Sequence, residues 1–289
     1  MIDYPGFNLR LAKFLKKRGT RVYYYISPKV WAWKQSRVKT IRKYIDRMYV
    51  IFPFETEFFA SRGYRVNYFG NPLVDSVAKG IAESDDPAGF RSANGLDQRP
   101  VIALLSGSRV QEVKKMLPGM VKISDSYLDY QFVVAGVKSV PAEIYDRILS
   151  GTDVKVVYGQ TYSLLRCSEV ALVTSGTATL ETALAGVPQV VCYRTSSLTY
   201  HLARSFLKIR FISLVNLIMD REIVKELIQN DFNEKNLASE INLLLPGGWK
   251  RDIVISEYRR LAGLLDGRGA GKKVAEDIYH SLLMVNNVN

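Results

Sequence analysis

Hydrophobic and polar positions along the chain follow two alternating patterns. Short apolar runs closed by Gly or Pro predict strands, and apolar residues three or four positions apart predict the helices between them. The first part of the sequence predicts strands at 21–27, 47–52 and 66–72, and helices at 8–18, 35–45 and 54–63. The opening residues "MID" resemble the end of a further strand. Such a βα repeat is typical of an α/β protein with a parallel sheet.

A second βα series begins near residue 100. Its predicted strands are 101–107, 131–136, 154–159, 170–176 and 188–194, and its predicted helices are 112–127, 141–149, 161–167 and 178–185. After Arg194 the pattern predicts helices only, at 199–209, 221–229, 234–245, 249–264 and 270–285. The fold class we expect is therefore α/β with two Rossmann-like domains.

Four parts follow from these patterns. Residues 1–77 form a first Rossmann-like domain, which we expect to be incomplete because a doubly wound sheet needs more strands. The segment 78–99 is rich in acids, Gly and Pro and predicts a connector, which could include a short helix. Residues 100–246 form the second domain, and 247–289 are C-terminal helices. This tail could pack on its own chain, return to the first domain or reach a second subunit, which leaves a homo-oligomer open.

The composition argues against a zinc site, a His-based catalytic triad and a membrane-spanning helix. The chain has 289 residues, of which 47% are hydrophobic, and it has two Cys and two His. These few residues leave little room for a zinc site or a His-based triad, and the separated cysteines suggest a reducing compartment. No run of about 20 apolar residues could span a bilayer. The net charge is +12, and residues 10–47 hold thirteen Lys or Arg against one acid, Asp46. Such a segment predicts either a solvated surface or a face for an anionic membrane, substrate or nucleic acid.

The stretch "SGTATLE" joins a predicted strand to a predicted helix at 178–185. Gly176 lets the backbone approach a ligand, and either Ser175 or Thr177 could cap the helix. The helix N-terminus favours an anion, and Glu181, one turn further, could accept hydrogen bonds from ribose hydroxyls. The stretch therefore predicts a nucleotide site. The alternative is an ordinary capping box, with Glu181 one position out of register.

A second polar turn, "LLSGSRVQEV", also lies between a strand and a helix. It contains Ser106, Gly107 and Ser108, followed by Arg109, whose guanidinium matches the geometry of a phosphate. Neither turn has the spacing of a P-loop or of the G-x-G-x-x-G fingerprint. Two turns of this kind in one half of the chain predict a diphosphate ligand.

Asp3 follows the short strand at the start of the sequence. A carboxylate at the carboxyl end of a strand could act as a general base toward a hydroxyl. Asp3 could equally be a turn residue that caps helix 8–18.

Several motifs occur together and in order: "IDYPGFNLRLAKFLKKRG", "SPKVWAW", "FPFE", "SGTATLE" and "SLVNLIMDREIVKELIQ". This combination resembles the lipid-A-disaccharide synthases. The resemblance implies an inverting glycosyltransferase of the GT-B type. It would join UDP-2,3-diacylglucosamine to 2,3-diacylglucosamine 1-phosphate in lipid A biosynthesis, with UDP as leaving group and no cofactor or metal. Family members begin with a Gly-rich "GExSGD"-like loop that is absent here, so we expect this sequence to be either part of a longer one or a truncated form.

The resemblance also assigns roles to residues. Arg109 would hold the diphosphate, Glu181 would bind the ribose, and Asp3 would take the proton of the acceptor hydroxyl, so that Asp3 and Arg109 are the catalytic residues. The nucleotide pocket would further include Ser106, Gly107, Ser108, Ser175, Gly176, Thr177, Asn216, Arg221 and Glu222.

The first half of the chain would face the lipid. Segment 10–47, with Trp31 and Trp33, would contact the cytoplasmic side of the inner membrane and the phosphate of the acceptor, and no nucleic acid would be bound. Three alternatives stay open: another GT-B sugar-nucleotide enzyme, such as a 2-epimerase or a muramyl-type transferase; a basic binding module without activity; and a remnant that binds UDP without transferring a sugar.

Overall fold

The computed structural model describes residues 1–196, 210–265 and 267–286. Within these ranges the chain divides into two units. The first contains residues 1–75 and the chain from 263 onward, and the second contains residues 76–196 and 210–262. The helix predicted at 199–209 lies outside the described residues.

The first unit is built on a small parallel sheet. Its strands, in the order in which they pair, are β1 (Tyr23–Tyr25), β2 (Arg47–Val50) and β3 (Asn67–Tyr68). Ile2 forms a parallel bridge with Tyr25, as expected for the end of a strand. The helices of this unit are α1 (Pro5–Lys16), α2 (Arg37–Tyr44), α3 (Pro53–Ala60) and α14 (Ala270–Asn286). The sheet and helices enclose a core that includes Tyr24, Ile41, Met48 and Phe59.

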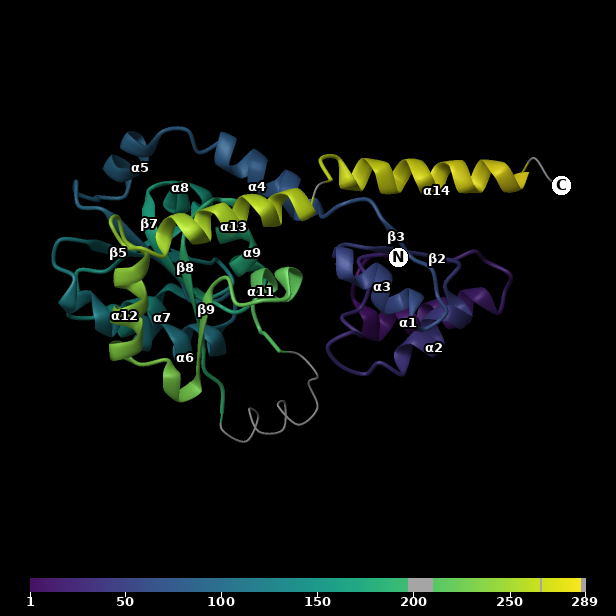
Figure 1. Cartoon of the computed structure of the whole chain (residues 1–289), viewed down its shortest axis with the longest axis horizontal. Coiled ribbons are helices and arrows are strands. Elements are labelled where there is room, and N and C mark those ends of the chain that lie inside the picture. The colour runs from purple at the N-terminus through teal and green to yellow at the C-terminus, as the bar shows by residue number, and fades with distance from the viewer. Residues whose placement is uncertain (197–209, 266, 287–289) are drawn as a thin grey trace. The chain divides into compact units, whose positions relative to one another are not determined.

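The second unit is a doubly wound parallel sheet of six strands (Figure 1). The strands are β4 (Val101–Leu105), β5 (Gln131–Gly136), β6 (Lys155–Tyr158), β7 (Ser168–Thr174), β8 (Gln189–Tyr193) and β9 (Lys225–Ile228). They pair in the order β6-β5-β4-β7-β8-β9, so the chain moves outward from β4 to one edge and then returns to build the other half from β7. The point where this order reverses lies between β4 and β7, the usual ligand position in such sheets.

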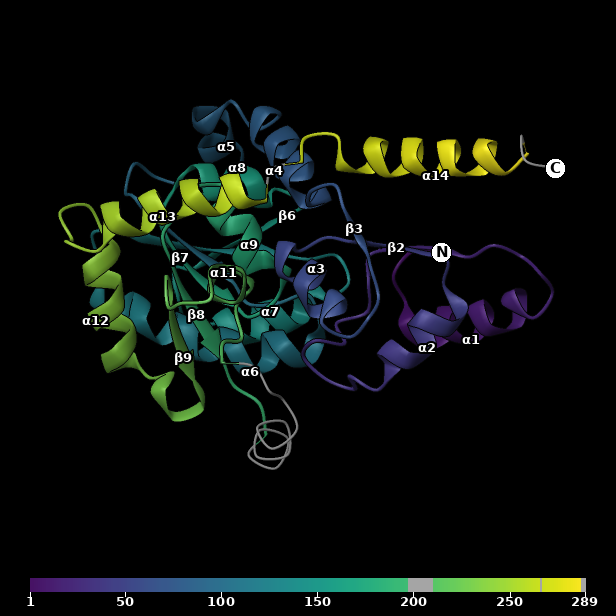
Figure 2. The ribbon, with the colours of Figure 1, turned by 45° about the vertical axis from the view of Figure 1, so that its right-hand side comes forward.

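Helices cover both faces of this sheet (Figures 1 and 2). One face carries α5 (Pro87–Ala93), α8 (Thr161–Arg166) and α9 (Thr177–Leu184). The other carries α6 (Val110–Val121), the 3-10 helix η1 (Lys122–Ser126), α7 (Ala142–Leu149) and α12 (Glu234–Leu244). The remaining elements are α4 (Pro72–Ala82), α11 (Leu214–Met219), η2 (Gln229–Asp231) and α13 (Arg251–Leu264).

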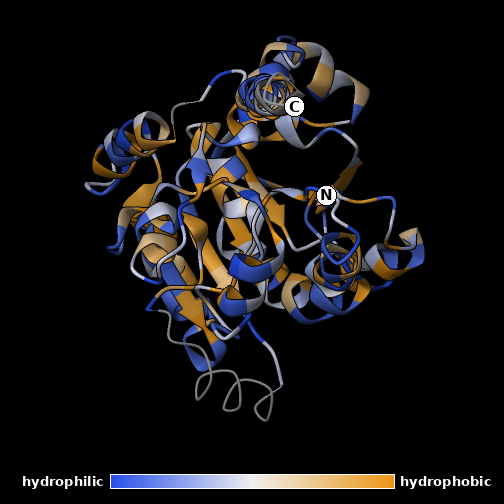
Figure 3. Ribbon diagram, turned by 90° about the vertical axis from the view of Figure 1, so that its right-hand side faces the viewer, coloured by the Kyte–Doolittle hydropathy of each residue, from blue (hydrophilic) through white to orange (hydrophobic). Residues whose placement is uncertain are grey.

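The strands of the second unit are hydrophobic along most of their length (Figure 3). Every residue of β4 and β5 is buried. A strand that is covered on both faces must be apolar at consecutive positions, which is why these segments are near-continuous Val, Ile, Leu and Ala runs. Among the described residues, no helix has the length and hydrophobicity needed to cross a bilayer.

The structure differs from the prediction at two places after Arg194: one predicted helix is wrong, and one helix was missed. Residues 221–229, predicted as a helix, contain strand β9, which pairs with β8 from Val190↔Lys225 to Tyr193↔Ile228. The short helix α11 before it was not predicted. It ends at Asp220, whose φ of 51° is left-handed and stops the helix. The backbone of 225–228 then bonds to the open edge of β8, a non-local interaction that outweighs the helical spacing.

The segment predicted as a connector with room for a short helix, 78–99, contains helical structure. The end of α4 and all of α5 lie there. Asp86 caps α5 by accepting a hydrogen bond from Gly89 N, and Phe90 is buried in the core against one face of the sheet. The C-terminal helices, grouped at 247–289 by the sequence, fall into different units, α13 mainly in the second and α14 in the first.

Candidate functional site

The two predicted turns leave the sheet at its switch point. Strands β4 and β7 are parallel neighbours, and Leu105 pairs with Val173 at their carboxyl ends. The turn that starts at Ser106 and the turn that starts at Ser175 therefore lie next to each other on the same edge. The structure thus brings together the two features from which the sequence predicts a diphosphate ligand.

The turn after β7 leaves the N-terminus of α9 open. Helix α9 begins at Thr177 with Gly176 as N-cap, and no side chain caps it. The prediction that Ser175 or Thr177 caps the helix is wrong: Ser175 Oγ donates to Ile212 O at 2.8 Å, and Thr177 is exposed. A Cβ placed on Gly176 would meet no atom within 4 Å. The first N–H groups of α9 therefore lack a side-chain acceptor, which suits an anion.

The turn after β4 differs because its own helix supplies a cap. Glu112 Oε2 accepts hydrogen bonds from Ser108 N at 2.9 Å and Arg109 N at 3.3 Å. Glu112 Oε1 also accepts from Arg109 Nη1 at 3.1 Å, although the Arg109 side chain is 81% exposed. Gly107 has a φ of 109°. Ser106 is fully buried, and its hydroxyl has no partner among the described atoms. The group that this turn offers to a ligand is thus the Arg109 guanidinium.

Glu181 is half-buried and lies one turn inside α9. Its Oε1 accepts a hydrogen bond of 3.0 Å from the hydroxyl of Tyr162 on α8. Burial, followed by the negative charge of Glu181, raises the pKa of Tyr162. The tyrosine therefore stays protonated and donates to the carboxylate. Glu181 is consequently an oriented acceptor close to an open helix N-terminus.

Asn216 is completely buried and bonds only within the protein. Its Oδ1 accepts from Ile223 N at 2.7 Å and Val224 N at 3.0 Å. Its Nδ2 donates to Val224 O at 2.8 Å and to Glu226 Oε1 at 2.9 Å. The amide thus connects α11 to the strand β9 and to the residues before it, and it leaves no free polar atom for a ligand.

Arg221 and Glu222 lie beyond the C-terminal end of α11. Arg221 pairs with Glu257 on α13, and Glu222 accepts from Lys225 Nζ at 3.2 Å. Both side chains are exposed. Their partners connect them to the surface around α13 and β9, and the structure shows no contact between them and the two turns.

Asp3, in the first unit, has an exposed side chain beside the bridge to β1. Its carbonyl oxygen accepts from Asn8 Nδ2 at 2.6 Å and from the Tyr24 hydroxyl, whose pKa burial raises to about 12. Tyr4, not Asp3, is the N-cap of α1, and no side chain caps that helix. Helix capping therefore does not explain Asp3. Its φ of 43° and that of Tyr4, 47°, are left-handed, a strained conformation common at functional sites.

Three residues of this region were missed from the sequence: Glu112, Tyr162 and Glu226. Glu112 lies three positions after Arg109, which is the spacing of a capping box, so its role as a helix cap could have been recognised from the sequence. Glu226 accepts hydrogen bonds from Ile212 N and Ser213 N, both at 2.9 Å. No local pattern marks Tyr162 or Glu226, because their partners are distant in sequence. In the described part of the chain, no three His, Cys, Asp or Glu side chains are grouped to hold a metal ion.

Comparison with known proteins decides the family. The family profile described as lipid-A-disaccharide synthetase matches residues 1–264. The lipid-A-disaccharide synthase of Myxococcus xanthus is 37% identical over 289 residues, covering 98% of this chain and 74% of the relative. That of Anaeromyxobacter dehalogenans is 38% identical over 286 residues, covering 96% and 73%. The chain belongs to the lipid-A-disaccharide synthase family. This confirms the predicted family and its enzyme class, the glycosyltransferases.

Solved structures agree on the fold. UDP-GlcNAc 2-epimerase from Neisseria meningitidis, bound to UDP-GlcNAc, has a TM-score of 0.64 at 12% identity and covers 94% of this chain and 73% of its own. Anabaena HepE in complex with UDP-glucose has a TM-score of 0.54 at 12% identity, covering 94% and 76%. Together with the two parallel sheets, these similarities confirm the predicted α/β, GT-B-type fold.

Proposed function

We propose that this member of the lipid-A-disaccharide synthase family transfers 2,3-diacylglucosamine from UDP to the 6-hydroxyl of 2,3-diacylglucosamine 1-phosphate. The observation that supports the donor site is the pair of turns at the β4–β7 switch point. The diphosphate binds at the open N-terminus of α9, with Arg109 as its cation and Glu181 at the ribose. The proposal includes no cofactor, because Arg109 and the N-terminus of α9 supply positive charge for the diphosphate.

The proposed chemistry is a direct displacement at the anomeric carbon. The acceptor hydroxyl attacks the anomeric carbon from the face opposite UDP, its proton passes to Asp3, and the bond to UDP breaks with inversion. Preorganised donors stabilise the charge that develops on the leaving diphosphate. The first turn of α9 supplies such donors, and the exposed guanidinium of Arg109 turns toward the diphosphate to add its charge. The inference that Asp3 is the base rests on its exposed carboxylate and strained backbone.

The surface around Asp3 supports an acylated acceptor. Ile2, Tyr4 and Phe7 are exposed to 65%, 73% and 57%, and they flank the carboxylate in sequence. Exposed apolar side chains in one short segment suggest contact with a lipid. Trp33 is also exposed, whereas Trp31 packs against Phe54 with ring centroids 5.1 Å apart. We therefore propose that Trp33, and not Trp31, contacts the lipid.

Replacement of Arg109 tests the proposal. Arg109→Ala should lower turnover by about two to three orders of magnitude, the usual effect of losing one preorganised donor. Arg260→Ala is the matched control, because Arg260 forms the same kind of i,i+3 pair with Glu257 away from the turns. The measurement is disaccharide formed from both sugar substrates. Equal rates for the two variants would contradict the role of Arg109. Conversion of the UDP-sugar without an acceptor would contradict the transferase assignment.

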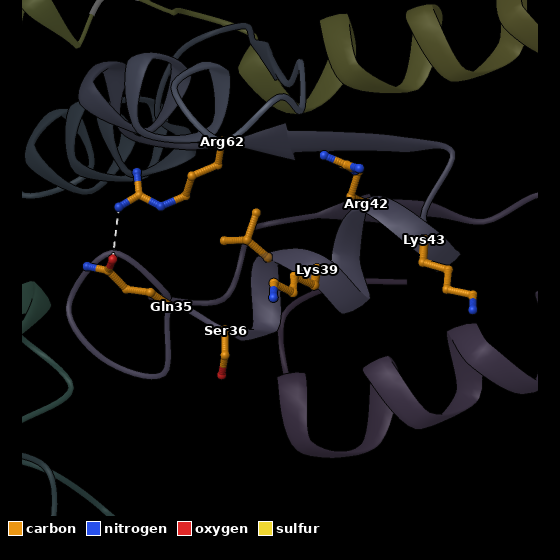
Figure 4. Close-up of a pocket in the computed structure, with 7 residues that line it drawn as sticks. Gln35, Ser36, Lys39, Arg42, Lys43 and Arg62 are labelled. Carbon is orange, nitrogen blue, oxygen red and sulfur yellow. Dashed lines mark hydrogen bonds between the residues drawn. The ribbon is translucent and has the colours of Figure 1, made fainter.

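We further propose that the chain contacts the cytoplasmic face of the inner membrane through its basic segment. A hollow of ≈ 730 Å³ on the first unit is lined by Gln35, Ser36, Val38, Lys39, Arg42, Lys43 and Arg62, without an acidic residue (Figure 4). Arg62 is held by a 2.8 Å hydrogen bond from its Nη2 to Gln35 Oε1. Uncompensated cations in a hollow attract anionic headgroups.

Vesicle binding tests this contact. The triple variant Lys39→Gln, Arg42→Gln and Lys43→Gln should sediment less with vesicles of anionic phospholipid. Zwitterionic vesicles should bind the original chain weakly in the same assay. The control variant carries Lys114→Gln and Lys115→Gln, which remove exposed charges from α6 in the second unit. Identical sedimentation of both variants would refute the basic hollow as the contact.

A further inference from the structure

The hydroxyl of Tyr162 holds one of the two oxygens of Glu181. Tyr162 Oη lies 3.0 Å from Glu181 Oε1. Within the described residues, no donor reaches the other oxygen, Oε2. Burial and the adjacent carboxylate raise the pKa of Tyr162, so the hydroxyl keeps the proton that it donates. The carboxylate therefore has one oxygen occupied by the protein and one oxygen left for a ligand.

The ring of Tyr162 is itself fixed by a glycine. Gly80 lies inside α4, where glycine is less favourable than alanine. A Cβ on Gly80 would lie 2.1 Å from Cδ2 of Tyr162 and 2.4 Å from its Cε2. The ring thus lies directly against the helix backbone, and it also packs on the core that contains Leu164 and Leu165. Packing on both sides leaves the hydroxyl little freedom to move.

We propose that Tyr162 is a positioning residue that makes the donor site selective for ribonucleotides over 2′-deoxyribonucleotides. The inference rests on the proposed function, in which Glu181 binds the ribose. A carboxylate side chain that rotates freely loses conformational entropy when it binds a diol. A carboxylate that Tyr162 already holds has lost this entropy before the ligand binds, so binding costs less free energy. With Oε1 occupied, the remaining oxygen is presented in one orientation to the ribose hydroxyls. Loss of the tyrosine hydroxyl should therefore weaken the recognition of the diol more than the binding of the diphosphate.

Calorimetric titration of the full chain with UDP and with 2′-deoxy-UDP measures this selectivity. The ratio of the two dissociation constants should fall by about three- to tenfold in Tyr162→Phe, the equivalent of one hydrogen bond. Affinity for 2′-deoxy-UDP should change little. Tyr127→Phe is the matched control, because it removes a hydroxyl that donates to Asn242 Oδ1 at 2.8 Å in the same unit.

Gly80→Ala provides a second, independent perturbation. Its methyl group must displace the Tyr162 ring, so the ratio should fall as in Tyr162→Phe while the hydroxyl is still present. A purely structural role for Tyr162 predicts equal losses for both nucleotides, and that result would overturn the inference. An unchanged ratio in Tyr162→Phe would do the same while leaving UDP binding, and the proposed function, intact. Absence of UDP binding by the original chain would instead refute the proposed function.

Discussion

Replacing Asn216 with alanine tests how the region beside the nucleotide turns is held together. The amide is 0% exposed and makes four hydrogen bonds, with Ile223, Val224 and Glu226. Alanine removes all four and leaves the N–H groups of Ile223 and Val224 buried without an acceptor. It also deprives a carboxylate oxygen of Glu226 of a donor.

The expected loss of stability follows from these groups. A buried polar group without a partner costs about 1–3 kcal/mol. Two such N–H groups therefore predict a decrease of about 2–6 kcal/mol in the free energy of unfolding, which is large for a single substitution. UDP affinity should fall as well, because Glu226 also accepts from Ser213 N, and Ile212 O accepts from Ser175. The effect on the nucleotide would be transmitted through the backbone.

Urea denaturation followed by circular dichroism measures the change, and calorimetry measures UDP binding. Asn236→Ala is the control, because the Asn236 side chain makes only an exposed 2.9 Å hydrogen bond to Asp231 O. Its effect should stay within about 0.5 kcal/mol. If Asn216→Ala abolished UDP binding while stability changed by less than about 1 kcal/mol, the reasoning would be refuted. Asn216 would then contact the nucleotide directly.

Three further substitutions test other parts of the structure. Gly107→Ala places a Cβ 2.6 Å from the side chain of Glu112, which caps α6. In urea denaturation this variant should lose more stability than Gly151→Ala, because Gly151 also has a positive φ but has no atom near its Cβ position. Burial raises the pKa of Glu55 from its ordinary value of 4.5 to about 7. The unfolded chain then ionises first, so stability should fall by about 3 kcal/mol between pH 4.5 and 7, and Glu55→Gln should lack this slope in urea midpoints. Asp277→Ala leaves the buried Tyr49 hydroxyl without its 2.7 Å acceptor and should lower the melting temperature, with Asp277→Asn as the milder change.

The sheet of the second unit was largely predictable. The predicted strand 131–136 coincides with β5, and 101–107 and 188–194 enclose β4 and β8. These strands are covered on both faces, so burial requires an uninterrupted apolar run that a reader of the sequence can see. In these strands, the apolar residues that the sequence shows are the ones that the folded protein buries.

The failure at β9 has a different origin. Ile223, Val224, Leu227 and Ile228 have a spacing that fits one face of a helix, and nothing local contradicts it. The strand forms because β8 offers an unpaired edge and because Asn216 binds the backbone at 223–224. Both causes lie outside the segment itself. Periodicity alone could not reveal them.

The sequence identified the two polar turns, but it did not reveal the hydrogen-bond partners of their side chains. Small residues, an arginine and an acid after two strands indicated an anion site, and the sheet order places both turns together. What the sequence could not show is which of these groups the protein itself occupies. Glu181 is engaged by Tyr162 through a contact across 19 positions, and Asn216 turned out to be fully bonded internally. Availability of a polar atom depends on tertiary contacts.

The two turns contribute to anion binding in unequal ways. At α6 the carboxylate of Glu112 already neutralises the partial positive charge of the helix N-terminus and accepts its N–H groups. At α9 no side chain does so. In the proposed donor site, a diphosphate would therefore be stabilised most at α9, and α6 would contribute through Arg109. To reach a diphosphate, Arg109 must break its ion pair with Glu112. This costs little free energy, since an exposed ion pair contributes at most about 1 kcal/mol. The guanidinium can thus turn from its own helix to the ligand at little cost, while Glu112 remains as the cap that keeps the turn in shape.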